Sequence, residues 1–546
     1  MNQFLRPGAI TEPAIDATRD AFDRLTFLGW RAGLAAIVAG LAISFFLFGY
    51  ALIYWRNADM DFMVIYNALV LNDGKPQLFF DHTAYLTILS VQFWFRLAHA
   101  LGLLDAWSLS AMPSSSNTAA FDAAMNGAVR AGRLLAFLIA TGCVLIFAAL
   151  VRRIVRDWRV ALIATLAFAL SGGIAVHSRI LRSELLAACP VIFALMILIA
   201  IGRRAHPARP LGMAVAAALC VLGLENKVQA LLLIGALPLV VMPFGSTASR
   251  SVAFWKNRRS GWLTAGLAAL AAIAAAWAAW PLIATGLDRA LLDAAQFHPL
   301  LSGRFGVYQA ALLLLIGGCM VAYAAIWHIS ASETVTSIAA VAAGALIALT
   351  ALDIEYNTGN VIAVINPLEK MLTFADANTS TVANGSNPQG ILLLLFDGIA
   401  SVLARYTFVL HSSPRPTVFL TWLIAPGIVY AWRRGERLAA IQALLLLSAA
   451  IGIDALGVRR GLKSEYFIFT DPLIILAGAI LLDRTIGDLR FRKWTYPVAM
   501  MLLGLHIAVG QAEPIKYAFM RRGPESICEW SPHYMPLLPP PWCRPP

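Results

Sequence analysis

Long runs of apolar residues, separated by short polar connections, follow one another along almost the whole chain. Most runs have the length, about 15–25 residues, that an α-helix needs to cross the hydrocarbon core of a bilayer. A membrane β-barrel would instead show short segments of alternating polarity. The pattern predicts an all-α polytopic membrane protein with about thirteen transmembrane helices, at 33–55, 131–151, 159–176, 184–202, 211–224, 228–244, 262–284, 309–328, 335–352, 417–432, 438–457, 465–482 and 495–511.

The composition supports this class of protein. Of the 546 residues, 60% are hydrophobic and only 13% are charged, which excludes a soluble globular domain. The formal net charge is +12, but the arginines are scattered between the spans and form no continuous basic face, so nucleic-acid binding is not expected. Residues 1–28 have no signal-peptide apolar core, and the first span is expected to act as an uncleaved anchor.

The basic residues also predict the orientation in the membrane. Cytoplasmic loops are enriched in Lys and Arg. If residues 1–32 lie in the cytoplasm, basic clusters fall in alternate loops, at 152–159, 203–209, 250–259, 433–437 and 484–493. The segment 389–410 is interrupted by Asp397 and Arg405, and we expect it to lie in the outer interface as an amphipathic helix.

Thirteen crossings divide the chain into three regions. A cytoplasmic segment (1–32) precedes the transmembrane region (33–512), and a short extracytoplasmic tail (513–546) follows it. Cys528 and Cys543 lie in that tail, where an oxidising compartment would allow them to pair. The first extracytoplasmic loop (56–130) holds two amphipathic stretches, 61–71 and 83–102, separated by the turn sequence NDGKP, and helices lying flat on the outer leaflet are expected for both.

Acidic residues in this first loop are candidates for chemistry. Carboxylates just outside a span are costly unless they are solvated, paired or used. Asp61, or alternatively Asp59, could act as a catalytic base, although both also suit the start of the 61–71 helix as solvated acids. Asp81 and His82 either position an acceptor or close a turn. His298, in a later outer loop, either contacts substrate or is only solvated.

Several Lys and Arg residues fall in connections predicted to be extracytoplasmic, whereas basic residues are normally enriched in cytoplasmic loops. They occupy very short outer connections in the sequences HSRILRSE, LENKVQ and GVRRGLKSEY. Snorkelling to lipid headgroups is one explanation. Their convergence into a phosphate pocket at the membrane surface is the other. The resulting substrate-binding candidates, including neighbours in the same segments, are Arg179, Arg182, Glu184, Lys227, Arg459, Arg460, Lys463 and Tyr466.

The order of these segments resembles a known family. One span, an acidic outer loop, FFDHTAYLTILSVQFWFRLAHALG, HSRILRSELLAACPVIFALM and a late SEYFIFTDPLIILAGAILL follow each other as in the GT-C class of membrane glycosyltransferases. The chain is similar to the protein O-mannosyltransferases and the lipid A aminoarabinose transferases over roughly residues 30–245. DHTAYL resembles their D/E-H-P-P-L motif, with Thr83 and Ala84 in place of both prolines.

The resemblance implies a polyprenyl-phosphate-linked sugar as donor, and transfer on the extracytoplasmic face with a loop-one aspartate as base. A single base driving direct displacement predicts inversion at the anomeric carbon. The expected partners are the membrane, the lipid-linked donor and a glycan, lipid or protein acceptor. The expected location is the bacterial inner membrane, with a periplasmic active site. No cofactor is implied, although Asp59-x-Asp61 has the D-x-D form that binds metal in other sugar transferases.

Two other functions are compatible with the sequence. A transporter or flippase for a lipid-linked or anionic substrate would use the outer cations as an entry vestibule. It would also be expected to carry ionisable residues near span centres and repeat-related broken helices, whereas here the polar residues gather at the outer ends of the spans. A non-catalytic partner in envelope assembly is the third possibility.

Overall fold

The computed structural model describes residues 12–77, 84–203, 207–245, 253–290, 301, 306–353, 366–369, 371, 389–407, 415–457, 464–485, 489–519, 523–529 and 531–543. Every regular element among these residues is a helix, as the apolar pattern predicts. Helices satisfy their backbone hydrogen bonds internally, which the bilayer interior requires.

The helices fall into three consecutive groups along the chain. The first comprises α1 (Glu12–Phe45), η1 (Phe46–Tyr50), η2 (Tyr54–Asn57), α2 (Ala58–Asn72), α3 (Tyr85–Ala100), α4 (Thr118–Ile154), α5 (Trp158–Ala169), α6 (Gly172–His177) and α7 (Ser183–Gly202). The second comprises α8 (Arg209–Asn226), α9 (Ala230–Val241), η3 (Met242–Phe244), α10 (Ala253–Lys256), α11 (Arg258–Ala278), α12 (Trp280–Leu287), α14 (Gly306–Ile326) and α15 (Ala331–Asp353). The third comprises α18 (Gln389–Thr407), α19 (Val418–Arg433), α20 (Arg437–Gly457), η7 (Ser464–Phe469), α21 (Asp471–Thr485), α22 (Leu489–Phe519), η8 (Pro524–Ile527) and α23 (Ser531–Tyr534).

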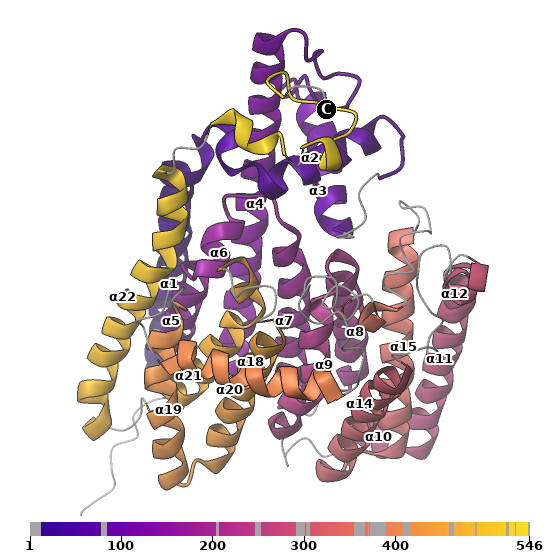
Figure 1. Cartoon of the computed structure of the whole chain (residues 1–546). Coiled ribbons are helices and arrows are strands. Elements are labelled where there is room, and N and C mark those ends of the chain that lie inside the picture. Colours follow the sequence, from indigo (N-terminus) through magenta and orange to yellow (C-terminus); the bar gives the residue numbers. More distant parts are fainter. Residues whose placement is uncertain are drawn as a thin grey trace, which may run out of the picture.

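A broad helical bundle carries a smaller domain on one end (Figure 1). We name the smaller part the first-loop domain: it comprises η2, α2, α3, the connection 101–117, the first half of α4 and the C-terminal residues 523–543. Each part has its own hydrophobic core. The 37-residue helix α4 joins them. At 1.5 Å per residue it is about 55 Å long, well beyond the ~30 Å hydrocarbon core, so it extends past the bilayer into the first-loop domain.

The predicted spans coincide with helical segments, and the whole chain is an integral membrane protein. By length and composition, seven helices among the described residues could cross a bilayer, and five shorter apolar helices accompany them. The segment predicted as one span at 159–176 is divided into α5 and α6, because Ser171 starts a new helix by accepting a hydrogen bond from the Ile174 amide at 3.4 Å. The number of crossings stays a prediction.

Helix α18 runs across the bundle rather than along it (Figure 1). The Tyr406 hydroxyl donates to Asp454 Oδ2 at 2.9 Å, near the end of α20, and the Thr421 hydroxyl donates to the Tyr406 carbonyl at 2.7 Å. The helix therefore packs over one end of α19 and α20. That the segment 389–410 lies in the outer interface without crossing the membrane stays a prediction.

The two predicted stretches of the first loop are the helices α2 and α3. Gly74, in the NDGKP turn, has a φ of +71° and ends α2, as a glycine at a helix C-terminus commonly does. Helix α3 exposes apolar side chains such as Phe93 (69% exposed) and Leu97 (39%). Helix α2 differs from the prediction, because residues 61–70 are buried on every side by α3, α4 and the C-terminal residues, so it does not lie flat on a membrane surface.

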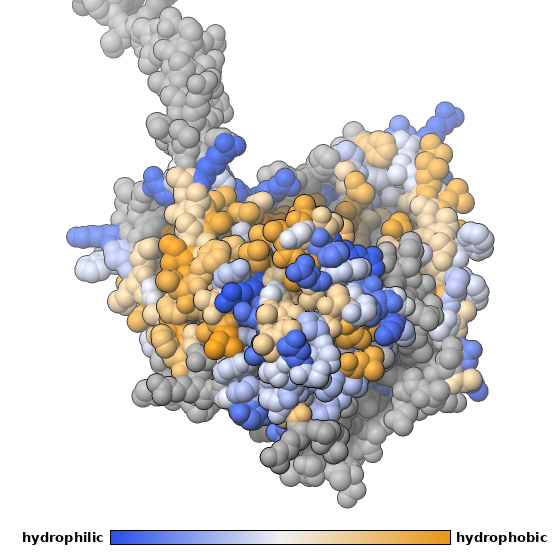
Figure 2. Space-filling model, turned by 90° about the horizontal axis from the view of Figure 1, so that it is seen from above, coloured by the Kyte–Doolittle hydropathy of each residue, from blue (hydrophilic) through white to orange (hydrophobic). Residues whose placement is uncertain are grey.

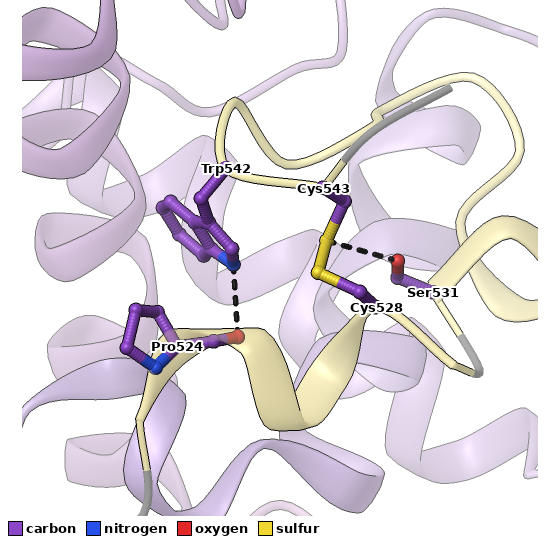
Figure 3. The surroundings of a disulfide bond; sticks show 5 residues. All are labelled: Pro524, Cys528, Ser531, Trp542 and Cys543. Atoms are coloured by element: carbon purple, nitrogen blue, oxygen red, sulfur yellow. Dashed lines mark hydrogen bonds between the residues drawn. A yellow bond between two sulfur atoms is a disulfide. The ribbon is translucent and has the colours of Figure 1, made fainter. Parts of the chain in front are cut away.

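A disulfide-closed strap completes the first-loop domain (Figure 3). The strap consists of residues 523–543, and Cys528 and Cys543 form a disulfide within it, the pairing that the sequence allows. The Trp542 indole donates to the Pro524 carbonyl at 2.9 Å, and the Leu537 amide donates to the Tyr66 hydroxyl of α2 at 3.2 Å. The strap thus covers α2 from outside. Seen from above, this end of the molecule shows hydrophilic groups near its centre among more apolar surroundings (Figure 2).

Candidate active site

A cluster of charged side chains lies where three short connections meet. These are the turn between α6 and α7, the end of α8, and η7. Lys227 Nζ lies 2.5 Å from Glu184 Oε1, and Arg182 Nη2 lies 3.2 Å from the same oxygen. Arg182 Nη2 also lies 3.4 Å from Glu465 Oε1. Three segments that the sequence predicted to converge therefore share one ion-pair network.

Glu184 is the centre of this network. Its carboxylate is fully buried in the first turn of α7, where the helix dipole favours a negative charge. His177 Nε2 lies 3.7 Å from Glu184 Oε2, while His177 Nδ1 lies 2.7 Å from the Gly173 carbonyl. The Lys227 ammonium lies 5.4 Å from the centre of the Tyr466 ring, within the range of a cation–π contact.

Among the contacts that the structure describes, the network pairs two cations with two carboxylates. Arg182 and Lys227 face Glu184 and Glu465. Buried charges persist only when they are paired in this way. Sequence analysis expected these cations to bind a donor phosphate, but in this structure they bind carboxylates of the chain itself. A phosphate would have to take over those contacts.

Asp61 lies beside this network, in the first turn of α2. Its carboxylate is fully buried: Oδ2 accepts from Arg133 Nε at 3.0 Å, and Oδ1 accepts from the Leu181 amide at 2.6 Å. Leu181 precedes Arg182 directly, so the predicted base and the predicted phosphate-binding turn are neighbours. Burial raises the pKa of the Asp61 carboxyl, while the Arg133 guanidinium and the Leu181 amide oppose that shift.

The start of α3 is anchored at the same place. The Ala84 amide donates to the Asn226 carbonyl at 2.9 Å, and Asn226 Oδ1 accepts from the Thr87 amide at 3.1 Å. The Asn226 side-chain amide donates in turn to the Ser183 carbonyl. Because Asn226 precedes Lys227, this one residue fixes the first loop, α7 and α8 relative to each other.

Arg179 does not join the network. Its guanidinium donates to the Ala175 carbonyl, to Ser44 and to Gln511 Oε1, the last at 3.0 Å. These contacts tie the α6–α7 turn to α1 and α22. Sequence analysis grouped Arg179 with Arg182, but the two side chains bind different parts of the molecule.

Seven further candidates lie outside the side chains that the structure describes. They are Asp59, Asp81, His82, His298, Arg459, Arg460 and Lys463. Their proposed roles stay predictions. Within the described part of the chain, no group of three or more His, Cys, Asp or Glu side chains converges as a metal site.

Comparison with known proteins gives matches among solved structures alone. No family model and no curated protein matches the chain. The chain is similar to the oligosaccharyltransferase AglB of the archaeon Archaeoglobus fulgidus in complex with an inhibitory peptide and a dolichol-phosphate, with a TM-score of 0.47 and 14% identity over 94% of this chain and 61% of that one. The oligosaccharyltransferase of the same organism with zinc and sulfate also has a TM-score of 0.47, at 13% identity over 93% of this chain and 57% of that one. The chain thus spans about three fifths of their length.

Several residues of the network were not among the sequence candidates. His177 and Glu465 lie in the quoted segments HSRILRSE and SEYFIF, but they were not singled out. Arg133 carried a clearer signal, because an arginine inside the apolar run GRLLAFLIA needs a buried partner. That partner is Asp61.

A second buried ion-pair network packs against η7. Arg415 Nη2 lies 2.8 Å from Asp471 Oδ1, and the same guanidinium also pairs with Asp454. The guanidinium carbon lies 4.6 Å from the centre of the Phe467 ring, so the network contacts η7 directly. This second network therefore holds the segment that carries Glu465 and Tyr466.

Proposed function

We propose that this chain is a membrane glycosyltransferase of the GT-C type, which transfers a sugar from a polyprenyl-phosphate-linked donor to an acceptor at the extracytoplasmic membrane surface. The observation that carries the proposal is the convergence of Arg182, Glu184 and Lys227 with Asp61 at the boundary between the first-loop domain and the helical bundle. A lipid-linked donor has its phosphate at that depth and its hydrocarbon chain in the bilayer.

The proposed reaction is a direct displacement. An acceptor hydroxyl oxygen forms a bond to the anomeric carbon of the sugar, and the bond from that carbon to the phosphate oxygen breaks. Asp61 takes the proton of the hydroxyl, and polyprenyl phosphate leaves with its negative charge. Because one base drives one displacement, the anomeric configuration is inverted.

The cations of the network are proposed to stabilise the departing phosphate. Of the two cations that pair with Glu184, Arg182 has the more accessible side chain, with 11% of it exposed, whereas Lys227 has only 2%. Arg182 is therefore the first group that a phosphate would meet. By binding it, the phosphate would replace Glu465 and one contact with Glu184, and a phosphate suits the planar guanidinium through paired hydrogen bonds.

The same geometry argues against a transporter. The carboxylates of the described buried ion pairs lie near helix ends, such as Glu184 in the first turn of α7, Asp454 in the last turn of α20 and Asp471 at the start of α21. A transport path would place such groups near span centres, where the substrate passes. Groups at helix ends suit chemistry at the membrane surface.

The test uses the purified full chain in detergent, a polyprenyl-phosphate sugar and a glycan acceptor. Release of polyprenyl phosphate is measured with wild-type protein, Asp61→Asn and the double variant Asp61→Asn/Arg133→Gln. The double variant removes both charges of the buried pair and should recover thermal stability that the single variant loses. We expect turnover to fall at least 100-fold in both, because loss of a general base has an effect of this order.

The matched control is Asp105→Asn, which changes an exposed aspartate of the same domain. It should keep wild-type turnover. If the double variant instead regains turnover together with stability, Asp61 serves the fold and another group is the base. If wild-type protein releases no polyprenyl phosphate from any such donor, the transferase proposal is wrong.

A further inference from the structure

An apolar groove lies between α19 and α21. These two helices lie in the part of the bundle away from the first-loop domain (Figure 1). Its volume is about 440 Å³. Apolar side chains such as Leu423, Val429 and Leu482 line most of it, and Arg433 lies at one end. A cavity of this volume is large enough to hold one small-molecule ligand.

The groove is open because small residues face it from both helices. Pro426 and Gly427 of α19 line it on one side, and Gly478 of α21 lines it on the other. A Cβ atom at Gly478 would be 3.5 Å from the Ile424 side chain, which is an ordinary contact. A larger side chain at position 478 would therefore enter the groove without displacing backbone.

The length of the groove matches one leaflet of a bilayer. Leu423 and Arg433, which line opposite ends along α19, are ten residues apart, so the groove is about 15 Å long at 1.5 Å per residue. This is half of the ~30 Å hydrocarbon thickness. A hydrocarbon chain lying in it would reach from the Arg433 level to about the middle of the membrane.

Positive charge gathers at the Arg433 end. Arg433 is exposed, and no acidic side chain among the described residues pairs with it. Arg434 donates to the hydroxyl of Tyr430, a lining residue, at 2.8 Å. Arg437 and Arg484 lie at the same end, and Glu436, 3.7 Å from Arg484, offsets one of these charges. The predicted orientation places this end at the cytoplasmic surface.

We propose that this groove is a specific binding site for an anionic glycerophospholipid of the cytoplasmic leaflet. One acyl chain occupies the apolar part between α19 and α21, and the phosphate group binds Arg433. Basic pockets between membrane helices on the cytoplasmic side recognise anionic headgroups in this way. The site is separate from the candidate active site and does not depend on the proposed transferase activity.

The test titrates phosphatidylglycerol with long acyl chains into the purified full chain in neutral detergent. Native mass spectrometry measures the population of the one-lipid complex, and the melting temperature reports stabilisation. We expect Arg433→Ala to weaken binding about fivefold, which corresponds to ~1 kcal/mol for one basic residue at an anionic lipid surface. Phosphatidylcholine and the chain-free glycerophosphoglycerol headgroup should each bind at least fivefold more weakly to wild type.

Two further variants test the acyl chain, and one variant is the matched control. Gly478→Leu fills the groove from α21, and Val429→Trp fills it from α19. Because Val429 is exposed, the second substitution should leave the fold intact even if the first does not. Either should lower lipid occupancy while Arg433 is retained. Arg153→Ala removes an exposed arginine from the last turn of α4, outside the groove, and should leave binding unchanged.

Three outcomes would overturn the proposal. Equal loss of binding in Arg153→Ala and Arg433→Ala would mean general attraction to a basic surface. Unchanged occupancy in folded groove-filling variants would mean that no chain enters the groove. Equal binding of phosphatidylcholine would mean that the headgroup charge is not recognised.

Discussion

Glu184 is the residue on which most of the candidate site depends. It accepts from Lys227 and Arg182 and lies beside His177. A buried carboxylate with several cationic neighbours is stable only as long as those neighbours remain, since removing one partner leaves the other charge without compensation. Each member of the network should therefore be sensitive to substitution in stability as well as in activity.

Lys227→Met should destabilise the folded chain by about 3 kcal/mol, the lower end of the cost of breaking a buried ion pair, because Arg182 still faces Glu184. Unfolding in detergent measures the change. The double variant Lys227→Met/Glu184→Gln should recover part of the loss. Lys75→Met, at an exposed lysine whose ammonium lies 3.9 Å from Asp73, is the control and should change stability by less than about 1 kcal/mol. Equal effects at both lysines would contradict the buried network.

The proposed role of Asp61 also predicts a pH dependence. A base acts in its ionised form, so turnover falls as the pH falls through the pKa of the carboxyl. Burial raises that pKa above the ordinary value of about 4 for aspartate, so the acidic limb of kcat/KM should lie at a higher pH than 4. A pH profile measures it. An acidic limb at the ordinary value would show that another carboxyl controls turnover.

At the scale of elements, the site depends on a close approach between α6 and η7. A Cβ atom at Gly173 would lie 2.9 Å from the Ile468 amide nitrogen and 3.0 Å from its Cα, which are backbone atoms that cannot turn aside. Glycine is required at this position by packing, since α6 is an ordinary right-handed helix. The contact sets the distance between Arg182 and Glu465, which lie on the two connected segments.

Gly173→Ala should therefore displace η7, at a cost of about 1–3 kcal/mol for overpacking, and lower activity because η7 carries Tyr466, which contacts Lys227, away from the site. Thermal unfolding and turnover measure the two effects. Gly142→Ala in α4, where an added Cβ meets nothing within 4 Å, is the matched control and should keep both properties. Wild-type stability in Gly173→Ala would contradict the close approach.

The strap gives a second prediction at this scale. Cys528 and Cys543 close a loop with a sequence separation of 15, for which the chain-entropy model gives about 3 kcal/mol of stabilisation. Cys528→Ser/Cys543→Ser should lower the melting temperature, and reductant should lower that of the wild type to the same value without affecting the variant. Cys319→Ser, at a free cysteine, should behave as wild type. Insensitivity of wild type to reductant would contradict a stabilising disulfide.

Sequence patterns predicted elements better than contacts, for a physical reason. The apolar runs, the NDGKP turn at Gly74 and the convergence of HSRILRSE, LENK and SEYF follow from periodicity, turn chemistry and the cost of charge near lipid. Periodicity could not show that Arg179 and Arg182 diverge, because a turn of a few residues directs side chains by packing against distant elements. Nor could it assign Arg133 to Asp61, since the two lie 72 positions apart. The full burial of α2 likewise depends on the strap, which no local pattern connects to it.

For the whole molecule, the arrangement predicts which parts face opposite sides of the membrane. The first-loop domain lies at one end of the bundle, and α19 runs toward the other (Figure 1). Arg153 lies in the last turn of α4, which begins in the first-loop domain, and Arg433 lies in the last turn of α19. A single cysteine at Ser114, in the first-loop domain, should react with a membrane-impermeant maleimide in intact cells. One at Arg153 should react only after permeabilisation. Both variants are made in a chain without its four free cysteines, and labelling of both from the same side would contradict the predicted orientation.

The strap has a consequence for the order in which the chain matures. Leu537 and Tyr66 form a hydrogen bond across 471 positions of sequence, so α2 is covered by residues that a ribosome adds long after α2 itself has been synthesised. Until the strap has been synthesised, the apolar face of α2 that packs against it is exposed to solvent. The nascent domain should consequently be an early client of chaperones on the far side of the membrane, and it should reach its final form in one late step, when the strap docks.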